Sequence, residues 1–387
     1  MNMKKLSSFL LAAAMVLTLL SGCGAGGDGD SSQPQQPQES PSSQQEQQSS
    51  KPAESSQPEA EKGVRIFTDS CGREVEVPAD IQKVAPAGNP AQMMLYSLVP
   101  DRLVGWSEKL SNMTGKYMED KYASLPVFGK FYGKNASLNM EALVAAGPDV
   151  IIDVGEVKKN LKEDLDGLQE QIGIPVVFIE ETMDTMGQAY TMLGDLLGCA
   201  GDAKPLADYC DKTVSEAKKK AASIPEDKRL TVYYGEGEGG LNANPAGSLH
   251  ADVIDLVGGV NVTETDVGSS SAGSQVTMEQ LLLWNPDILL FGPDVDYDAI
   301  SADPIWKDLD AVQKGSYFQT PNGPYNWMGR PPAVNRVLGI KWFGNLLYPE
   351  VFDYDIPAEA KEFYKLFYHY DLTDEEIREL MKNSTGM

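Results

Sequence analysis

The apolar positions of this chain fall into short runs that alternate with stretches of helical spacing. Residues 150–153 and 175–179 are continuous apolar runs, as in strands buried on both faces of a parallel sheet. Residues 64–67 and 74–78 flank a turn at Gly72 and predict a hairpin. Strands that alternate with helices predict an α/β fold with right-handed crossovers. Strands are expected at residues 64–67, 74–78, 83–86, 103–106, 150–153, 175–179 and 230–234.

An internal repeat divides this pattern into two similar halves. Residues 139–152 and 277–290 share Met-Glu-x-Leu followed by Pro-Asp and an apolar run, and the second copy begins 138 residues after the first. Asn139 and Thr277 are suitable N-caps, and each copy has a glutamate in its first helical turn, where a carboxylate favours the helix dipole. Each Pro-Asp ends a helix and starts a strand. We interpret the repeat as a duplicated lobe.

A long helical stretch joins the two halves. Met186, Tyr190, Leu193 and Leu197 have helical spacing, which continues beyond a Gly-Asp break. Because one helix and no crossing strand joins the lobes, we expect little hinge motion. The expected organisation is a signal segment (1–23), a tether (24–62), an N-terminal α/β lobe (63–184), a spanning helix (185–225), a C-terminal α/β lobe (226–356) and a C-terminal helix that packs on the body (357–387).

The first 62 residues predict export and a membrane anchor. Lys4 and Lys5 precede an apolar stretch at residues 6–20 that is too short for a membrane span and typical of a signal peptide. It ends in Leu-Ser-Gly-Cys23, which resembles the bacterial lipobox, in which the cysteine is lipidated; the alternatives are an uncleaved anchor or a chance cysteine. Residues 24–62 are Gly, Ser, Gln, Pro and Glu without an aromatic residue, and predict a disordered tether. We therefore expect a lipid-anchored protein on the extracytoplasmic face, periplasmic if the organism has an outer membrane.

The composition excludes several classes of protein. Asp and Glu number 57 against 32 Lys and Arg, a net charge of −25, which is unsuited to a nucleic-acid binder. His250 and His369 are the only histidines, so one chain cannot build a zinc site from three histidines. We expect no metal site and no cofactor. Cys71, Cys199 and Cys210 are interpreted as free or buried thiols, although Cys199 and Cys210 flank a Gly-Asp turn and a bond between them stays open.

Over roughly residues 64–382 the chain resembles the ABC-importer substrate-binding proteins for iron complexes and vitamin B12. The resemblance lies in the lipobox, the tether, the opening DSCGREVEVP at residues 69–78, the repeated Met-Glu-x-Leu segments and the single spanning helix. Cys71 departs from the small residue usual at its position. The resemblance implies two Rossmann-like lobes joined by a single long α-helix, a ligand cleft between them and no catalysis. It also implies that Glu141 and Glu279, one exposed on each lobe, dock on arginines of the permease.

The cleft should lie beyond the carboxyl ends of the parallel strands, where helices begin. A loop at residues 321–332 is rich in aromatic and polar residues, as a recognition loop would be. Arg330 could present its guanidinium to an anion or form a structural salt bridge, Trp327 could stack on a flat ligand or lie in the core, and His250 is interpreted as a surface or helix-start residue. The candidate ligand-binding residues are Asn89, Trp106, Lys130, Tyr132, Tyr234, Asn242, Tyr325, Trp327 and Arg330.

Two cargoes fit this interpretation. The first is a metal complex, such as a ferric siderophore, haem or a corrinoid, which a monomeric binding protein passes to the transmembrane subunits of an ABC permease. The second is a tetrahedral oxyanion such as molybdate or tungstate, which would need backbone N–H groups together with Arg330 or Lys130. An extracellular hydrolase is disfavoured because the sequence has no nucleophile elbow, no His-Glu-x-x-His and too few histidines. A structural adhesin would not need two matched lobes.

Overall fold

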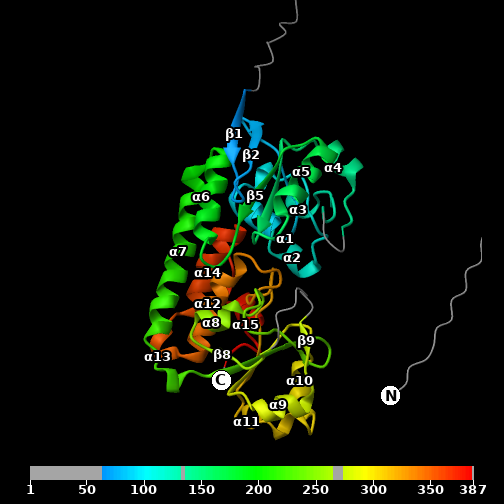
Figure 1. Ribbon diagram of the computed structural model, residues 1–387. Helices are drawn as coiled ribbons and strands as arrows, with labels where there is room; N and C mark the ends of the chain where they lie inside the picture. The colour runs from blue at the N-terminus through cyan, green and yellow to red at the C-terminus, as the bar shows by residue number, and fades with distance from the viewer. Residues whose placement is uncertain (1–62, 132–135, 265–272, 386–387) are drawn as a thin grey trace, which may run out of the picture. The chain divides into compact units, whose positions relative to one another are not determined.

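A computed structural model describes residues 63–131, 136–264 and 273–385, which belong to one compact unit (Figure 1). The expected signal segment, Cys23 and the tether lie outside the described residues. Among the described helices, none is both long and apolar enough to cross a bilayer.

Three parallel strands form the sheet of the N-terminal lobe, in the order β3–β4–β5. An antiparallel hairpin of β1 and β2 precedes it, as the sequence predicts. The strands are β1 (Val64–Thr68), β2 (Glu74–Pro78), β3 (Val84–Pro86), β4 (Val150–Gly155) and β5 (Val176–Glu180). The helices are α1 (Asn89–Leu98), η1 (Pro100–Arg102), α2 (Asn112–Lys116), α3 (Asp120–Ala123), α4 (Met140–Ala146) and α5 (Leu161–Ile172).

The turn between β1 and β2 is held by the buried side chain of Asp69. Its Oδ1 accepts hydrogen bonds from the backbone N–H groups of Cys71 at 3.2 Å and Arg73 at 2.9 Å. Arg73 Nη1 forms an ion pair with Asp69 Oδ2 at 3.0 Å and also donates to the carbonyl of Val176 on β5 at 2.9 Å. The opening motif of the sequence thus fastens the hairpin to the sheet of the N-terminal lobe.

The strand expected at residues 103–106 does not form. The N–H of Val104 donates to Val84, whereas the N–H of Trp106 donates to Pro126. Leu103 and Trp106 therefore make isolated bridges to two different neighbours instead of one continuous ladder.

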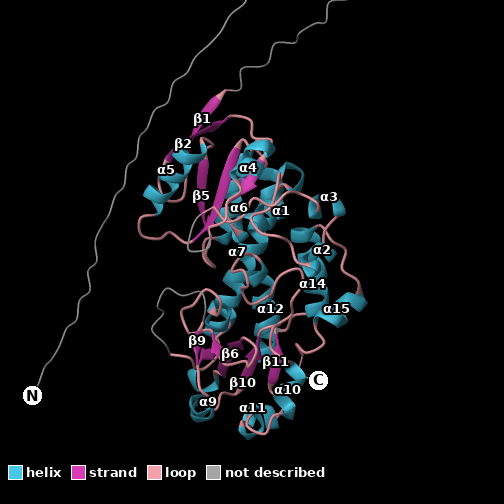
Figure 2. Cartoon of the chain, turned by 90° about the vertical axis from the view of Figure 1, so that its right-hand side faces the viewer, coloured by secondary structure: helices cyan, strands magenta, loops and turns pink. Residues whose placement is uncertain are grey.

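The C-terminal lobe contains a mixed sheet in the order β11–β10–β6–β7–β9, with β8 beside β6. β6, β8, β10 and β11 are parallel, and β7 and β9 add antiparallel pairs. Figure 2 shows the sheets of the two lobes as separate groups of strands. The strands are β6 (Thr231–Glu236), β7 (Asn242–Ala243), β8 (Val260–Asn261), β9 (Ser274–Gln275), β10 (Ile288–Phe291) and β11 (Tyr317–Gln319). The helices are η2 (Glu226–Lys228), α8 (Asp252–Leu256), α9 (Met278–Trp284), α10 (Tyr297–Ala302), η3 (Trp306–Asp308) and α11 (Asp310–Gln313).

Both copies of the sequence repeat adopt the same local structure. Asn139 caps α4 by accepting from the N–H of Ala142, and Thr277 caps α9 by accepting from the N–H of Gln280. Each helix ends at a left-handed residue, Gly147 or Asn285, and leads into a buried parallel strand, β4 or β10. The paired helix-to-strand units predicted from the repeat are therefore present.

The range 185–225 contains two helices instead of the one expected there. α6 (Met186–Leu197) ends at Gly198, which has a φ of 66°, and α7 (Ala200–Ala222) starts two residues later. A left-handed glycine at this position ends a helix, because its backbone conformation suits few other residues. α7 is the single long helix that joins the lobes, and Figure 1 shows it running beside both of them, from α6 to α13 (Pro349–Phe352).

Helices from both ends of the chain build the shared core. The C-terminal range 357–387 also contains two helices instead of one, because α14 ends at left-handed His369 and Thr373 starts α15 with a capping box. One apolar cluster packs α1, α6, α7, α12 and α14 together, and smaller clusters lie against each sheet. Cys71, Cys199 and Cys210 are free thiols, so Cys199 and Cys210 do not pair. The remaining helices are α12 (Asn335–Leu347), α13 (Pro349–Phe352), α14 (Ile356–Tyr368) and α15 (Asp374–Leu380).

Candidate ligand cleft between the lobes

Three neighbouring hollows lie at the carboxyl ends of the parallel strands. The first, of about 430 Å³, is lined by the C-terminal lobe, including Glu236, Asn242 and Asp294. The other two, of about 230 Å³ each, are lined from both lobes. Asn322 and Arg330 line both the first hollow and one of the two-lobed hollows. We call the three hollows together the cleft.

Arg330 is the central cation of the C-terminal side of the cleft. Its Nε lies 3.0 and 2.9 Å from the two carboxylate oxygens of Glu236, and its Nη2 also contacts Oε2. Nη2 donates to Asn244 Oδ1 at 3.1 Å. A two-pronged arrangement of this kind is the strongest geometry for an arginine–carboxylate pair. The salt bridge considered from the sequence is therefore present, at a position that still lines the cleft.

His250 lies beside this pair and is half-buried. Its Nδ1 is 2.6 Å from the carbonyl oxygen of Gly329, which makes Nδ1 the protonated nitrogen. Nε2 then accepts from Arg330 Nη1 at 3.5 Å. Burial, followed by the positive charge of Arg330, lowers the pKa of His250. The imidazole is thus neutral and supports Arg330, as a structural histidine does.

Glu108 organises the N-terminal side of the cleft. Lys130 Nζ lies 2.6 Å from Oε1, and Asn89 Nδ2 donates to Oε2 at 2.5 Å. Burial opposes ionisation of Glu108, but the bonds from Lys130 and Asn89 outweigh it and lower its pKa. Asn89 is placed at the start of α1 by Gly88, which precedes it in extended conformation. Two of the candidate residues thus meet on one carboxylate that the sequence analysis had not selected.

Arg336, at the start of α12, connects the two lobes at the floor of the cleft. It bonds Glu181, which follows β5, at 2.8 Å, and Asp252, the first residue of α8, at 2.5 Å. The side chains of Arg336 and Glu181 are both 1% exposed. Burial raises the pKa of Asp252 to about 6, against the opposing effect of Arg336. No periodicity or motif marks these three residues, because they come from separate segments of the chain.

The structure brings some candidates to the cleft and buries others. Asn89, Lys130, Asn242, Tyr325 and Arg330 line it. Tyr132 lies outside the described residues.

Three aromatic candidates belong instead to the core. Trp106 is 1% exposed and donates from Nε1 to the carbonyl of Tyr122, and Trp327 is 2% exposed and packs edge-on against Trp342. Tyr234 is also fully buried, but its hydroxyl donates to Glu236 Oε1 at 3.1 Å and so helps to hold a carboxylate that lines the cleft. The ring of Trp106 lies against Tyr96 of α1, and that of Trp327 lies against Trp342 of α12, contacts that sequence spacing does not reveal.

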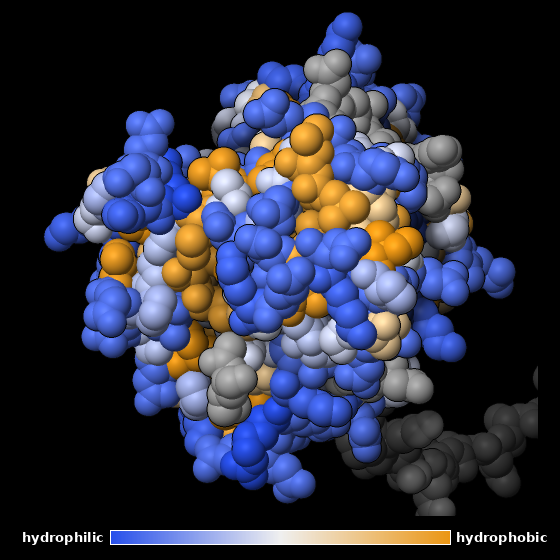
Figure 3. All heavy atoms as spheres, turned by 90° about the horizontal axis from the view of Figure 1, so that it is seen from below, coloured by the Kyte–Doolittle hydropathy of each residue, from blue (hydrophilic) through white to orange (hydrophobic). Residues whose placement is uncertain are grey.

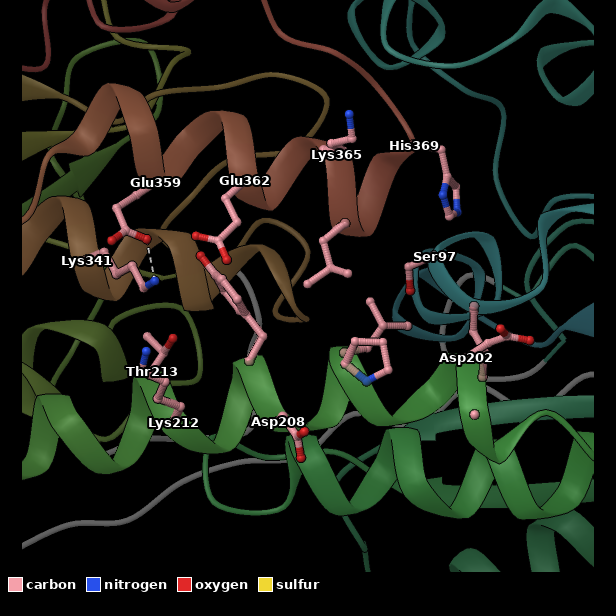
Figure 4. A pocket seen from close by; sticks show the side chains of 16 residues that line it. Ser97, Asp202, Asp208, Lys212, Thr213, Lys341, Glu359, Glu362, Lys365 and His369 are labelled. Atoms are coloured by element: carbon pink, nitrogen blue, oxygen red, sulfur yellow. Dashed lines mark hydrogen bonds and ion pairs between the residues drawn. The ribbon is translucent and has the colours of Figure 1, made fainter.

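A larger cavity of about 910 Å³ lies elsewhere, between α7, α12 and α14. Figure 4 shows Glu359 and Glu362 pointing from α14 toward α7, with Lys341 beside them. Lys341 Nζ is 2.5 Å from Glu359 Oε2 and lies 4.2 Å from the ring centroid of Tyr209. Because this cavity lies among helices, away from the strand ends that bind ligands in α/β folds, we place the candidate site in the cleft.

Comparisons with known proteins agree with this geometry. Residues 88–323, more than half of the chain, match the family described as periplasmic binding protein. The chain is 30% identical to an ABC transporter solute binding protein from Sulfurospirillum deleyianum, with a TM-score of 0.75, covering 82% of this chain and 99% of that one. It is 25% identical to a periplasmic solute binding protein from Veillonella parvula, with a TM-score of 0.68, covering 83% and 98%.

One curated relative has a more specific name. It is the iron(3+)-hydroxamate-binding protein YxeB of Bacillus subtilis, 24% identical over 193 residues, or 47% of this chain. The match spans 58% of the length of YxeB, less than two thirds of that protein.

Proposed function

Because the chain belongs to the periplasmic binding protein family, we propose that it captures a metal complex in the cleft and delivers it to an ABC permease. It is an extracytoplasmic solute-binding protein of an ABC transporter, not an enzyme. Proteins of this kind deliver small molecules to their permeases. The cargo, the anchor and the docking residues are the parts we propose.

The size of the cleft is the observation that carries the cargo proposal. The hollow on the C-terminal side alone measures about 430 Å³, within the range of sites for drug-sized molecules, and two further hollows adjoin it. A tetrahedral oxyanion would leave most of this space unfilled. The partly exposed ring of Tyr325 adds an aromatic surface to the wall. A ferric complex with an organic ligand shell fits this space, and the name of YxeB supports the same class of cargo.

We expect a ferric complex to stabilise the purified protein against heat, whereas molybdate should leave the melting temperature unchanged. A ligand at 100 times its dissociation constant stabilises the folded state by about 2.7 kcal/mol, which a thermal shift detects readily. A ferric trihydroxamate, haem, a corrinoid and molybdate would be compared at matched concentrations. A shift with molybdate alone would contradict the proposed cargo.

We propose that Cys23 carries the lipid anchor, because it follows a signal-like apolar segment. Cys23→Ser should move the protein from the membrane fraction to the soluble extracytoplasmic fraction, measured by immunoblot after cell fractionation. Ser21→Ala, two residues away, is the matched control and should leave the protein membrane-bound. Retention of the Cys23→Ser variant in the membrane would contradict lipid anchoring at this residue.

Glu141 and Glu279 are proposed to dock on basic residues of the permease. Each is exposed and is the second residue of a repeat helix, α4 or α9. The pKa of Glu279 is lowered by its own backbone N–H and by Thr277, so its carboxylate is ionised. One turn further along α9 lies Leu283, which is 79% exposed. Figure 3, a view of the C-terminal lobe from below, shows apolar patches among hydrophilic residues. An exposed carboxylate beside an apolar residue suits a protein partner that presents an arginine.

A further inference from the structure

Three of the cations that line the cleft form ion pairs with carboxylates. On the C-terminal side Arg330 pairs with Glu236, on the N-terminal side Lys130 pairs with Glu108, and at the floor Arg336 pairs with Glu181. Among the described residues that line the three hollows, six carboxylates face five cations. A ligand entering this cleft therefore meets no excess of positive charge.

The Glu236–Arg330 pair is less exposed than the Lys130–Glu108 pair on the opposite side of the cleft. The side chain of Glu236 is 8% exposed and that of Arg330 is 32% exposed, so the pair is shielded from salt better than Lys130–Glu108, whose side chains are 40% and 41% exposed. The Tyr234 hydroxyl holds Glu236 Oε1 from below, and Asn244 and His250 hold the guanidinium from the side. Arg330 is thus held in place at the cleft wall while its charge is neutralised.

We infer that Glu236 determines the charge of the cargo, by neutralising Arg330 so that the cleft accepts an uncharged metal complex and rejects a polyanionic one. This inference rests on the proposed function. A ferric ion bound by three singly charged hydroxamates is neutral, whereas one bound by three doubly charged catecholates carries three negative charges. Only the second complex requires unmatched cations, because an anion placed beside Glu236 is repelled as strongly as Arg330 attracts it.

Glu236→Gln tests this role directly. The amide has nearly the shape of the carboxylate and keeps one acceptor oxygen for Arg330, but its charge is removed. The full-length wild type should bind a cyclic ferrioxamine, a neutral ferric trihydroxamate without a free amine, at least tenfold more tightly than a ferric triscatecholate. Glu236→Gln should bind the triscatecholate at least tenfold more tightly than wild type does, with ferrioxamine affinity changed less than threefold. The dissociation constants would be measured by fluorescence quenching.

Asp294→Asn is the matched control. Asp294 lines the same hollow and accepts from the N–H of Gly237 at 2.8 Å, so its replacement makes the same change in net charge without releasing Arg330. It should leave the triscatecholate affinity within threefold of wild type. The double variant Glu236→Gln with Arg330→Gln should bind the triscatecholate no more tightly than wild type does, because the unpaired cation is gone. The increase in triscatecholate affinity of Glu236→Gln alone should become smaller as the salt concentration rises.

The possible outcomes distinguish the role of Glu236 from the proposed class of cargo. Equal affinities of the wild type for the neutral and the anionic complex, or equal gains in Glu236→Gln and Asp294→Asn, would overturn the role of Glu236 and leave the cargo class standing. Failure of every ferric complex to bind either wild type or Glu236→Gln would overturn the proposed cargo and this inference with it. Thermal unfolding of each variant without ligand shows that it is folded.

Discussion

Replacing Glu141 and Glu279 together with alanine should reduce uptake of the cargo to the background level of cells without the binding protein. Both carboxylates are exposed and lie far along the chain from each other, at equivalent positions of α4 and α9. Neither lines the cleft, so the dissociation constant of the cargo should stay within twofold of wild type. Uptake of ⁵⁵Fe-labelled complex by whole cells, with binding measured on purified protein, separates docking from capture.

The control for this experiment uses two other helix-start carboxylates. Glu163 on α5 and Asp298 on α10 are exposed and also lie in first helical turns, one in each lobe. Replacing both with alanine makes the same change in net charge and should leave uptake at the wild-type rate. Wild-type transport by the Glu141→Ala, Glu279→Ala protein would refute the docking role, and equal losses in both double variants would point to net charge in place of specific contacts.

Arg336→Met should destabilise the folded protein by about 3–5 kcal/mol, as expected when one partner of a buried ion pair is removed. The substitution leaves Glu181 and Asp252 without a cation in a site where burial already raises the pKa of both. Unfolding by guanidinium chloride, followed by circular dichroism, measures the loss. A variant as stable as wild type would show that Arg336 does not hold the lobes together.

The pH dependence of this loss identifies its cause. Without Arg336 the pKa values of both carboxylates should rise further, so their ionisation in the folded protein costs most at neutral and higher pH. As pH falls through these raised values the carboxylates bind protons and the cost disappears, so the difference from wild type should be smaller at pH 5 than at pH 8. Lys204→Met, which breaks the exposed pair with Asp208, is the control and should cost less than about 1 kcal/mol at either pH.

The fold could be predicted from the sequence because its determinants are local. Apolar runs at β4 and β5, the caps Asn139 and Thr277, and the Asp69 turn act over a few residues, and the structure contains each of them. The extent of the joining helix was predicted less well. Helical spacing continues through Gly198, but the left-handed backbone of that glycine separates α6 from α7.

The cleft could be predicted only in outline. The rule that ligands bind at the carboxyl ends of strands selected Asn89, Lys130 and Asn242, and the composition of the loop at residues 321–332 selected Tyr325 and Arg330; all five line the three hollows. The same two arguments also selected Trp106 and Trp327, which lie in the core. Residue type and position cannot distinguish a ring on the cleft wall from one covered by a helix, because the packing of α1 on Trp106 and of α12 on Trp327 is decided only in the folded chain.

What the sequence determined by itself is the α/β alternation, the two matching helix-to-strand units and the family, since all three depend on short-range patterns of residues. Only the tertiary structure decided which charged side chains form ion pairs. Glu236 and Arg330 are 94 residues apart, and Glu181 and Arg336 are 155 residues apart. Charge pairing depends on distances of a few ångströms between segments that only the folded chain brings together, so the electrostatic character of the cleft followed from the structure.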